Sequence, residues 1–417
     1  MTFLYPFLTF LQPGILWPQL ADARPLLVLS ALALVVGVSR RADYARAAAF
    51  RHPVFICLLL FILAQGLSVY YSGVGAILGE WSYWSTYPIF VAISILLISN
   101  AAALRSYILG MLAGAMFVVC YGILAVFLVW PSAVGGRAGA YGMYENHNDY
   151  SFIIIQILPF LYLYFRTERG LLLRGLLGVS MLGCVLGIVM SLSRGGMLAL
   201  VLEALLIVLL GMQGRRRLLL LPPLILAGAV AIGYQWILRA ENQGDHYTAE
   251  QAQGSRFELW RAGKAMVSAH PLFGVGSRRF GEFAKLYGEL SHDQLGKNSH
   301  NTYVEVLAGS GILGFVPFML MLYYLVRELR RRPMKTGPPP IDATRIATLI
   351  ALYTIMFRAL LDAKAHDWSF YVFCAVGLAC AVLQRGADSS ARAPAASGPG
   401  GSGASAAQQA AGAARQG

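Results

Sequence analysis

The chain has 417 residues, of which 57% are hydrophobic and 13% charged, with a mean hydropathy of +0.60. Soluble domains carry roughly a quarter of charged residues, so this composition excludes an ordinary soluble protein and indicates a polytopic membrane protein. The net charge of +13 does not indicate nucleic-acid binding. The basic residues fall in short blocks between apolar runs, as the positive-inside rule requires.

A membrane-spanning helix needs roughly 20 apolar residues, and the sequence contains twelve candidate spans with approximate edges. The candidates are 3–20, 24–39, 53–72, 82–99, 104–130, 150–165, 173–192, 195–212, 218–237, 302–326, 345–361 and 367–384. The first pair and the pair on either side of Ser193 are short or closely joined. The sequence therefore predicts an all-α bundle of about twelve transmembrane helices over residues 1–384.

Clusters of basic residues occupy alternate connecting segments, and this alternation predicts the orientation. These segments share one side, which the positive-inside rule identifies as cytoplasmic. The clusters comprise Arg40, Arg41, Arg46, Arg51, Arg105, Arg166, Arg169, Arg174, Arg215, Arg216, Arg217, Arg327, Arg330, Arg331, Arg332 and Lys335. We therefore expect both termini on the cytoplasmic side and the remaining connecting segments on the opposite, outer side.

Two hydrophilic regions stand apart from the apolar runs. The long outer loop over 238–301 should contain short helices, one of them capped by Ser255 and ending near Ala269, where a His-Pro pair follows. Glycines then break the loop into shorter pieces. The tail over 385–417 is rich in Ala, Gly and Ser with few large apolar side chains, so we expect it to be disordered in the cytoplasm.

Arginines on the outer side oppose the positive-inside rule, so each of them requires a reason. Arg194 lies in a turn between two predicted spans, and Arg256 lies in the long loop. Arginine presents a rigid fork of donors that matches phosphate oxygens bidentately. The pair therefore suits a lipid-linked anion at headgroup depth, although Arg194 could equally anchor its turn by reaching lipid phosphates.

Other outer-side residues have weaker functional claims. Arg137, Arg278 and Arg279 fit a solvated surface at least as well as a binding site. The run Asn146–Asp149 could serve only as a cap for the helix that follows. Within the predicted spans, ionisable residues are functional candidates, and Glu203 is the deepest of them. Arg358 and Asp362, spaced i and i+4, could form a purely structural pair.

His300 stands where the long loop re-enters the membrane, in the run Asn298-Ser299-His300-Asn301. Histidine titrates near neutral pH, which suits a general base. A lone histidine is more often structural, so the residue type alone leaves both roles open. No Asp-X-Asp pattern occurs in the outer segments, and we therefore expect no metal site there.

Three motifs together resemble the O-antigen ligase and polymerase superfamily. They are Ser193-Arg194-Gly195, Gly254-Ser255-Arg256, and Asn298-Ser299-His300-Asn301, which precedes the glycine-rich run Gly309–Gly314. The similarity covers about residues 130–320, and the Asn-Ser-His-Asn run is its most specific element. The predicted layout of twelve spans also fits.

The resemblance implies an inverting glycosyl transfer, without metal or other cofactor, on the periplasmic face of a bacterial inner membrane. The donor would be an O-antigen glycan on undecaprenyl diphosphate, and the acceptor a sugar hydroxyl of lipid A–core. His300 would be the catalytic base, with Arg194 and Arg256 holding the diphosphate. Weaker candidates for binding donor or acceptor are Arg137, Arg278, Arg279, Asn298 and Asn301.

Three alternative functions remain open at the level of sequence. An O-antigen polymerase would use a second lipid-linked glycan as its acceptor, and a protein O-oligosaccharyltransferase would use a protein. A flippase or exporter of lipid-linked glycans would line the bundle with charge at mid-membrane, whereas here most of the notable charges lie at one face. The expected partners are therefore the lipid-linked donor, the acceptor and membrane lipids, and no nucleic acid.

Overall fold

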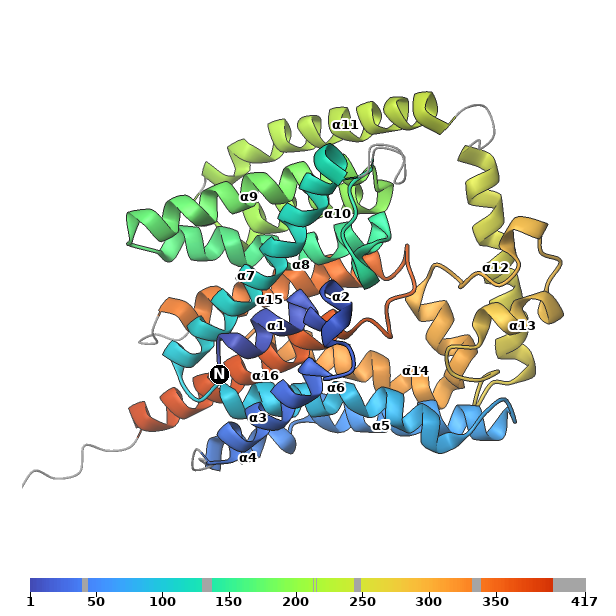
Figure 1. The fold of residues 1–417 in the computed structure, drawn as a ribbon, viewed down its shortest axis with the longest axis horizontal. Coiled ribbons are helices and arrows are strands. Elements are labelled where there is room, and N and C mark those ends of the chain that lie inside the picture. The colour runs from blue at the N-terminus through green and yellow to red at the C-terminus, as the bar shows by residue number, and fades with distance from the viewer. Residues whose placement is uncertain are drawn as a thin grey trace, which may run out of the picture.

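The computed structural model describes residues 1–39, 44–129, 137–212, 214, 216–243, 249–331 and 339–392. Across these ranges the chain forms helices joined by turns and short irregular segments, without a β-strand. Most of the helices lie side by side in one elongated bundle (Figure 1). The prediction of an all-α polytopic membrane protein is confirmed.

The described ranges contain long α-helices and a few shorter helical turns. The α-helices are α1 (Leu4–Leu11), α2 (Pro13–Leu16), α3 (Pro25–Ser39), α4 (Tyr44–Phe50), α5 (Pro53–Tyr71), α6 (Ile77–Leu97), α7 (Ala101–Leu124), α8 (His147–Thr167), α9 (Leu171–Ser191), α10 (Arg194–Leu206), α11 (Arg216–Gln243), α12 (Ala249–Ala269), α13 (Phe280–Tyr287), α14 (Thr302–Leu329), α15 (Pro339–Arg358) and α16 (Trp368–Arg392). The shorter helical turns are η1 (Pro18–Leu20), η2 (Ala125–Val129), η3 (Gly142–Tyr144), η4 (Ile207–Gly211) and η6 (His292–Gln294).

Seven helices in the described ranges are long and apolar enough to cross a membrane, so the predicted number of twelve is not confirmed. The seven segments are Pro53–Tyr71, Ala101–Leu128, His147–Thr167, Leu171–Ser191, Arg194–Gly211, Thr302–Leu329 and Trp368–Gly386. The first predicted span is instead broken at Gln12, whose φ of 50° is left-handed and interrupts the helix. Helix α3 has 15 residues and so measures only about 22 Å, shorter than a hydrocarbon core of roughly 30 Å.

Close approach of backbones holds α1 against α7. A Cβ atom at Gly110 would lie 2.1 Å from the Phe3 carbonyl oxygen, and one at Gly114 would lie 2.5 Å from that of Phe7. Only glycine permits these contacts, as in other membrane helix pairs where small residues line the interface. Helices α8 and α16 lie deepest in the bundle, with 78% of their apolar windows buried. The N-terminal helices thus pack on the outside of a core that is formed by helices later in the chain.

Polar contacts gather many of the basic helix ends at one end of the bundle. Glu328 near the end of α14 accepts a hydrogen bond from Arg385 of α16 at 3.1 Å and lies 3.5 Å from His52 at the start of α5. Arg105 at the start of α7 pairs with Glu168 at the end of α8 at 2.5 Å. Some of the segments predicted to share one side therefore meet in the structure: the start of α5 with the end of α14, and the start of α7 with the end of α8.

The long loop forms α12 and α13 beyond the other end of the bundle, at the right of Figure 1. Helix α12 ends at Ala269 as predicted, but the predicted N-cap at Ser255 is wrong, because the helix begins at Ala249. The residues Ala249 to Ala252 favour helix by composition, which extends α12 by more than a turn. The helix that starts at Ala249 continues through Gly254 and Ser255, so Ser255 does not start a new helix.

The C-terminal helix continues past the predicted boundary of the bundle. Helix α16 runs to Arg392, so the first residues of the predicted disordered tail are helical. Residues 393–417, the remainder of that predicted tail, lie outside the described residues.

The orientation can be tested with single cysteines at the two ends of the bundle. Leu286 of α13 is 68% exposed, and Ser39 at the end of α3 is exposed. In a background lacking Cys120, which is the exposed native cysteine, we expect Leu286→Cys to react with an impermeant maleimide once the outer membrane alone is permeabilised. Ser39→Cys should react only after inner-membrane lysis, and the opposite labelling pattern would contradict the predicted orientation.

Candidate functional site

Three long helices begin at one place, at the end of the bundle that lies nearest α12. Each has a polar N-cap whose side chain accepts a backbone N–H of the first turn: Asn146 for α8, Ser193 for α10 and Asn301 for α14. The first turns of helices have N–H groups without intrahelical partners and carry a partial positive charge. Their convergence creates a site suited to an anion.

Hydrogen bonds between the helix ends hold these N-termini together. The Ser193 hydroxyl donates to the Asn148 side-chain oxygen at 2.7 Å, which joins α10 to α8. The backbone N–H of Thr302 donates to the Ala359 carbonyl at 2.7 Å, which joins α14 to the segment after α15. Arg358, the last residue of α15, donates to the Asn148 carbonyl at 3.2 Å and so joins α15 to α8.

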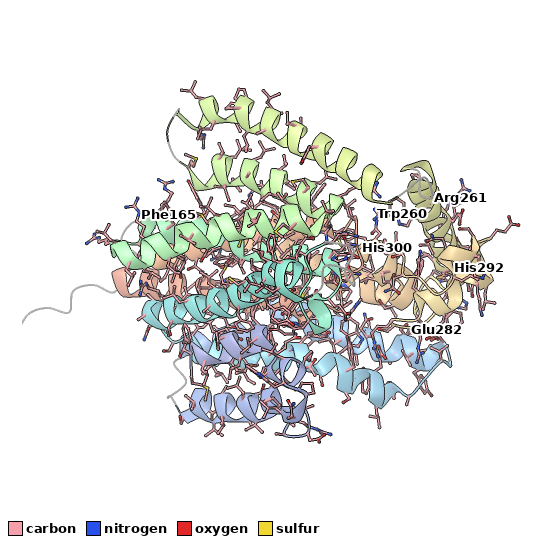
Figure 2. All side chains as sticks on the ribbon, turned by 45° about the horizontal axis from the view of Figure 1, so that its top comes forward. Phe165, Trp260, Arg261, Glu282, His292 and His300 are labelled. Carbon is pink, nitrogen blue, oxygen red and sulfur yellow. The ribbon has the colours of Figure 1, made fainter. Side chains whose placement is uncertain are left out.

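His300 lies at the start of α14 with 38% of its side chain exposed (Figure 2). Its φ of 49° is left-handed, a conformation that is uncommon for a residue with a Cβ atom. The flanking residues hold it there. Ser299 donates its N–H and hydroxyl to Glu305 at 2.9 and 2.8 Å, and Trp260 donates to the Ser299 carbonyl at 2.9 Å. On the other side of His300, Asn301 caps α14.

Asp362 is the carboxylate next to His300, and its i,i+4 spacing from Arg358 in the sequence left both a structural and a functional role open. Its Oδ1 lies 3.9 Å from His300 Nδ1, while its Oδ2 lies 3.7 Å from both the Arg358 guanidinium and the Lys364 ammonium. Its carbonyl accepts the Thr302 hydroxyl at 2.7 Å. Asp362 therefore touches the histidine, two cations and the first residue of α14.

Lys364 is a functional candidate that the sequence analysis missed. Its ammonium is buried and pairs with Asp149 in the first turn of α8. Lys364 lies between α15 and α16 on the predicted outer side, where a cation opposes the positive-inside rule as the outer-side arginines do. The run Asn146–Asp149 accordingly does more than cap α8, because its last residue binds the segment that carries Asp362.

Arg194 and Arg256 come together from different parts of the chain. Arg194 is the first residue of α10 and Arg256 lies in α12, and both side chains are half-buried. Burial lowers the pKa of Arg256; the Asp362 carboxylate opposes that shift, and the charge of Arg194 adds to it. Together with Arg358 and Lys364, these two arginines outnumber the carboxylates of Asp362 and Asp149. The excess of positive charge attracts an anionic ligand.

Gly195 makes room for the buried Arg358. A Cβ atom at Gly195 would lie 1.9 Å from Arg358 Nη1, so the guanidinium packs directly against the turn that carries Arg194. Arg358 is 2% exposed and its Nε finds no hydrogen-bond acceptor among the described residues. The Ser-Arg-Gly motif is thus explained in part by the close approach of α15.

The remaining candidates hold neighbouring loops. Arg137 donates to the carbonyls of Ser191 and Leu192, at 3.0 and 3.4 Å, and so supports the turn before Arg194. Asn298 is exposed two residues before His300, whereas Asn301 is buried as a cap.

Arg278 and Arg279 make their ion pairs away from His300. Arg278 binds Glu80 of α6 through two nitrogens, at 3.1 and 3.0 Å, and lies over the Tyr83 ring at 3.8 Å. The hydrogen bonds that Arg278 donates to the Glu80 carboxylate raise the pKa of Arg278. Arg279 pairs with Glu282 at the surface, at 2.6 Å. The first pair fastens the loop to α6, and the second is local to α13.

Glu203 lies apart from this cluster. It is fully buried in α10, and neither carboxyl oxygen has a hydrogen-bond partner among the described residues. Nine residues separate it from Arg194, or roughly 13 Å along the helix. The contacts of the His300 cluster do not involve it.

Residues 179–319 match the family model described as O-Antigen ligase. The match supports the O-antigen ligase superfamily. The matched O-antigen ligase domain runs from α9 into α14 and includes Arg194, Arg256 and His300, whereas the segment between α15 and α16 lies outside it. Comparison with curated proteins found no match. The O-antigen ligase family implies substrates that are, in general, lipid-linked glycans.

Because Arg358 packs against the α10 turn, alanine at Gly195 should affect the stability of the protein differently from alanine at Gly175. We expect Gly195→Ala to destabilise the protein by about 1–3 kcal/mol, because the methyl group would displace a buried guanidinium from Asn148 and Asp362. Gly175→Ala in α9 is the matched control, since nothing lies within 4 Å of its Cβ position. Thermal unfolding in detergent measures both, and equal midpoints for the two variants would contradict the packing account.

Proposed function

We propose that this protein is an O-antigen ligase. It transfers O-antigen polysaccharide from undecaprenyl diphosphate to a sugar hydroxyl of lipid A–core on the periplasmic face of the bacterial inner membrane. The observation that carries the proposal is the meeting of His300, Asp362, Arg194 and Arg256 inside or beside the O-antigen ligase domain. A base and a set of cations at one end of a membrane bundle match what this reaction requires.

The reaction is a single displacement at the anomeric carbon of the donor's first sugar. The acceptor hydroxyl oxygen attacks this carbon, and the bond between the carbon and the diphosphate oxygen breaks. The electron pair of that bond stays with the diphosphate, and the hydroxyl proton passes to His300 and later to solvent. Attack from the side opposite the leaving group inverts the configuration of the anomeric carbon.

His300 serves as general base in this proposal, and Asp362 is its positioning residue. With 38% of its side chain exposed, the imidazole is open to an acceptor sugar that approaches from outside the membrane. The carboxylate at 3.9 Å from Nδ1 orients the ring and stabilises the imidazolium that forms when the proton arrives. Asn298, exposed on the same segment, is proposed to bind the acceptor.

Arg194 and Arg256 stabilise the leaving diphosphate. Negative charge builds on the bridging oxygen as the glycosidic bond breaks, and preorganised donors aimed at that charge lower the barrier. The N-termini of α8, α10 and α14 add their partial charges at the same place. Because arginines meet the developing charge, the proposal requires neither a divalent metal ion nor any other cofactor.

The other predicted binding residues act through the segments that they hold. Arg137 supports the turn that presents Arg194, and Asn301 fixes the start of α14 beside His300. Arg278 and Arg279 hold the long loop through Glu80 and Glu282. Their loss should therefore lower activity by loosening the loop, and not by removing a contact to the transferred sugar.

His300→Gln tests the assignment of the base, because glutamine keeps a hydrogen-bonding group but cannot take up the proton. General-base catalysis contributes roughly 10²–10⁴-fold to a rate, so we expect transfer to fall by about that factor while the donor still binds. The measurement is transfer of lipid-linked O-antigen to lipid A–core by the purified protein in vesicles.

His292→Gln is the matched control, because this exposed histidine lies in the same loop, away from His300 (Figure 2). It should transfer at the wild-type rate. If His300→Gln also transfers at that rate, His300 is no base. If the products are longer chains still on the lipid carrier, the protein is a polymerase and not a ligase.

A further inference from the structure

Two aromatic rings lie on α12 directly after Arg256. The rings of Phe257 and Trp260 meet edge to face, with their centroids 5.5 Å apart and their planes at 80°. Phe257 is 47% exposed, although it lies in a helix with little apolar character outside the seven candidate spans. Packing within the fold does not account for an exposed aromatic side chain next to the segment that carries His300.

Trp260 is the fixed member of the pair. Its indole N–H donates to the carbonyl of Ser299 at 2.9 Å, the residue immediately before His300. Its ring also packs against a buried cluster that includes Leu259 and Phe280. The aromatic pair is therefore attached to the segment that carries the base, as Figure 2 shows for Trp260 and His300.

Helical geometry places the pair beside the diphosphate site. Successive residues turn by about 100°, so residues 256, 257 and 260 share one side of α12 within about 100° of arc. Arg256 on that side interacts electrostatically with Arg194 and Asp362. Trp260 thus lies about one turn of α12 from the guanidinium that we assign to the diphosphate, and it contacts the residue before the histidine that we assign to the acceptor. Phe257 lies beside Trp260 on the exposed side of the helix.

The donor's first sugar must lie near the same residues. Its anomeric carbon is bonded to the diphosphate in the donor and to the acceptor oxygen in the product, so it lies between Arg256 and His300. A pyranose ring has faces of C–H bonds, and these carry partial positive charge that suits the electron-rich face of an aromatic ring. The position and the chemistry of the rings both match this sugar.

Charged neighbours argue against a role for Phe257 in membrane insertion. The run Arg256-Phe257-Glu258-Leu259-Trp260-Arg261 contains three charged residues in six positions. Glu258 accepts hydrogen bonds from the N–H and hydroxyl of Ser291, at 3.1 and 2.9 Å, and Arg261 is exposed. Phe257 is therefore flanked by solvated groups, whereas an inserted helix presents a broad apolar face.

We propose that Phe257 and Trp260 form a sugar-binding subsite that stacks on the pyranose ring next to the donor diphosphate. The proposal rests on the proposed function, because it assigns the part of that site that receives the transferred sugar. The subsite positions the anomeric carbon for attack and favours a donor sugar with an unbroken C–H face.

Two substitutions at Phe257 separate stacking from simple apolar contact. Phe257→Tyr keeps the aromatic face, so its transfer rate and its KM for the donor should stay close to wild type. Phe257→Leu keeps apolar surface without the ring, and we expect its kcat/KM for lipid-linked O-antigen to fall about 3- to 10-fold. A rise in the KM for the donor should account for most of that fall.

Binding of undecaprenyl diphosphate that carries no sugar completes the test. Phe257→Leu should bind this sugar-free lipid as wild type does, because the subsite contacts only the sugar. Leu286→Ala, at an exposed position of α13, should change neither measurement. Equal unfolding midpoints for all variants would show that the differences arise in the site.

Several outcomes would overturn the subsite. Wild-type kinetics for Phe257→Leu, with a loss only in Phe257→Ala, would identify an apolar or membrane contact. An equal loss of sugar-free lipid binding would place Phe257 at the diphosphate. The proposed function is tested separately, because it requires His300→Gln to be inactive whichever result is found for Phe257.

Discussion

The first turns of α8, α10 and α14 meet at one end of the bundle, and the arrangement of the surrounding side chains depends on this meeting of helix N-termini. Each first turn has backbone N–H groups that need acceptors, and Asn146, Ser193 and Asn301 supply only part of that need. The partial charges that remain favour an anion at the surface of the membrane. Arg194 and Arg256 extend the same field outward, so the backbone and the side chains favour one kind of ligand.

Asp362 keeps this concentration of positive charge compatible with folding. Buried cations are stable only where a counter-charge and hydrogen bonds compensate for lost hydration, and Asp362 lies within 3.7 Å of both Arg358 and Lys364. Thr302 joins the start of α14 to the segment after α15, because its hydroxyl donates to the Asp362 carbonyl and accepts the backbone N–H of Lys364. His300 before α14 and the Asp362 carboxylate after α15 are therefore positioned by one shared set of contacts.

The sequence revealed the parts of the site that have local patterns. His300, Arg194 and Arg256 lie in short motifs on predicted outer segments. In the structure His300 lies 3.9 Å from Asp362, and Arg256 interacts electrostatically with both Asp362 and Arg194. Asp362 itself was ambiguous, because an i,i+4 carboxylate beside Arg358 has the same pattern whether it is structural or functional. The partner of Arg278, Glu80, is 198 positions away, and no local rule identifies such a pair.

The number of spans is not confirmed and the predicted start of α12 is wrong for a similar reason, since hydropathy does not register a break at Gln12 or a helix that continues through Ser255.

We propose that the converging helix ends and arginines bind a lipid diphosphate. Equilibrium binding of undecaprenyl diphosphate to the protein in nanodiscs tests it directly. Arg194→Ala and Arg256→Ala should each weaken binding by about 1.5–3 kcal/mol, with only partial recovery in the lysine variants. Wild-type affinity in both alanine variants would contradict the account.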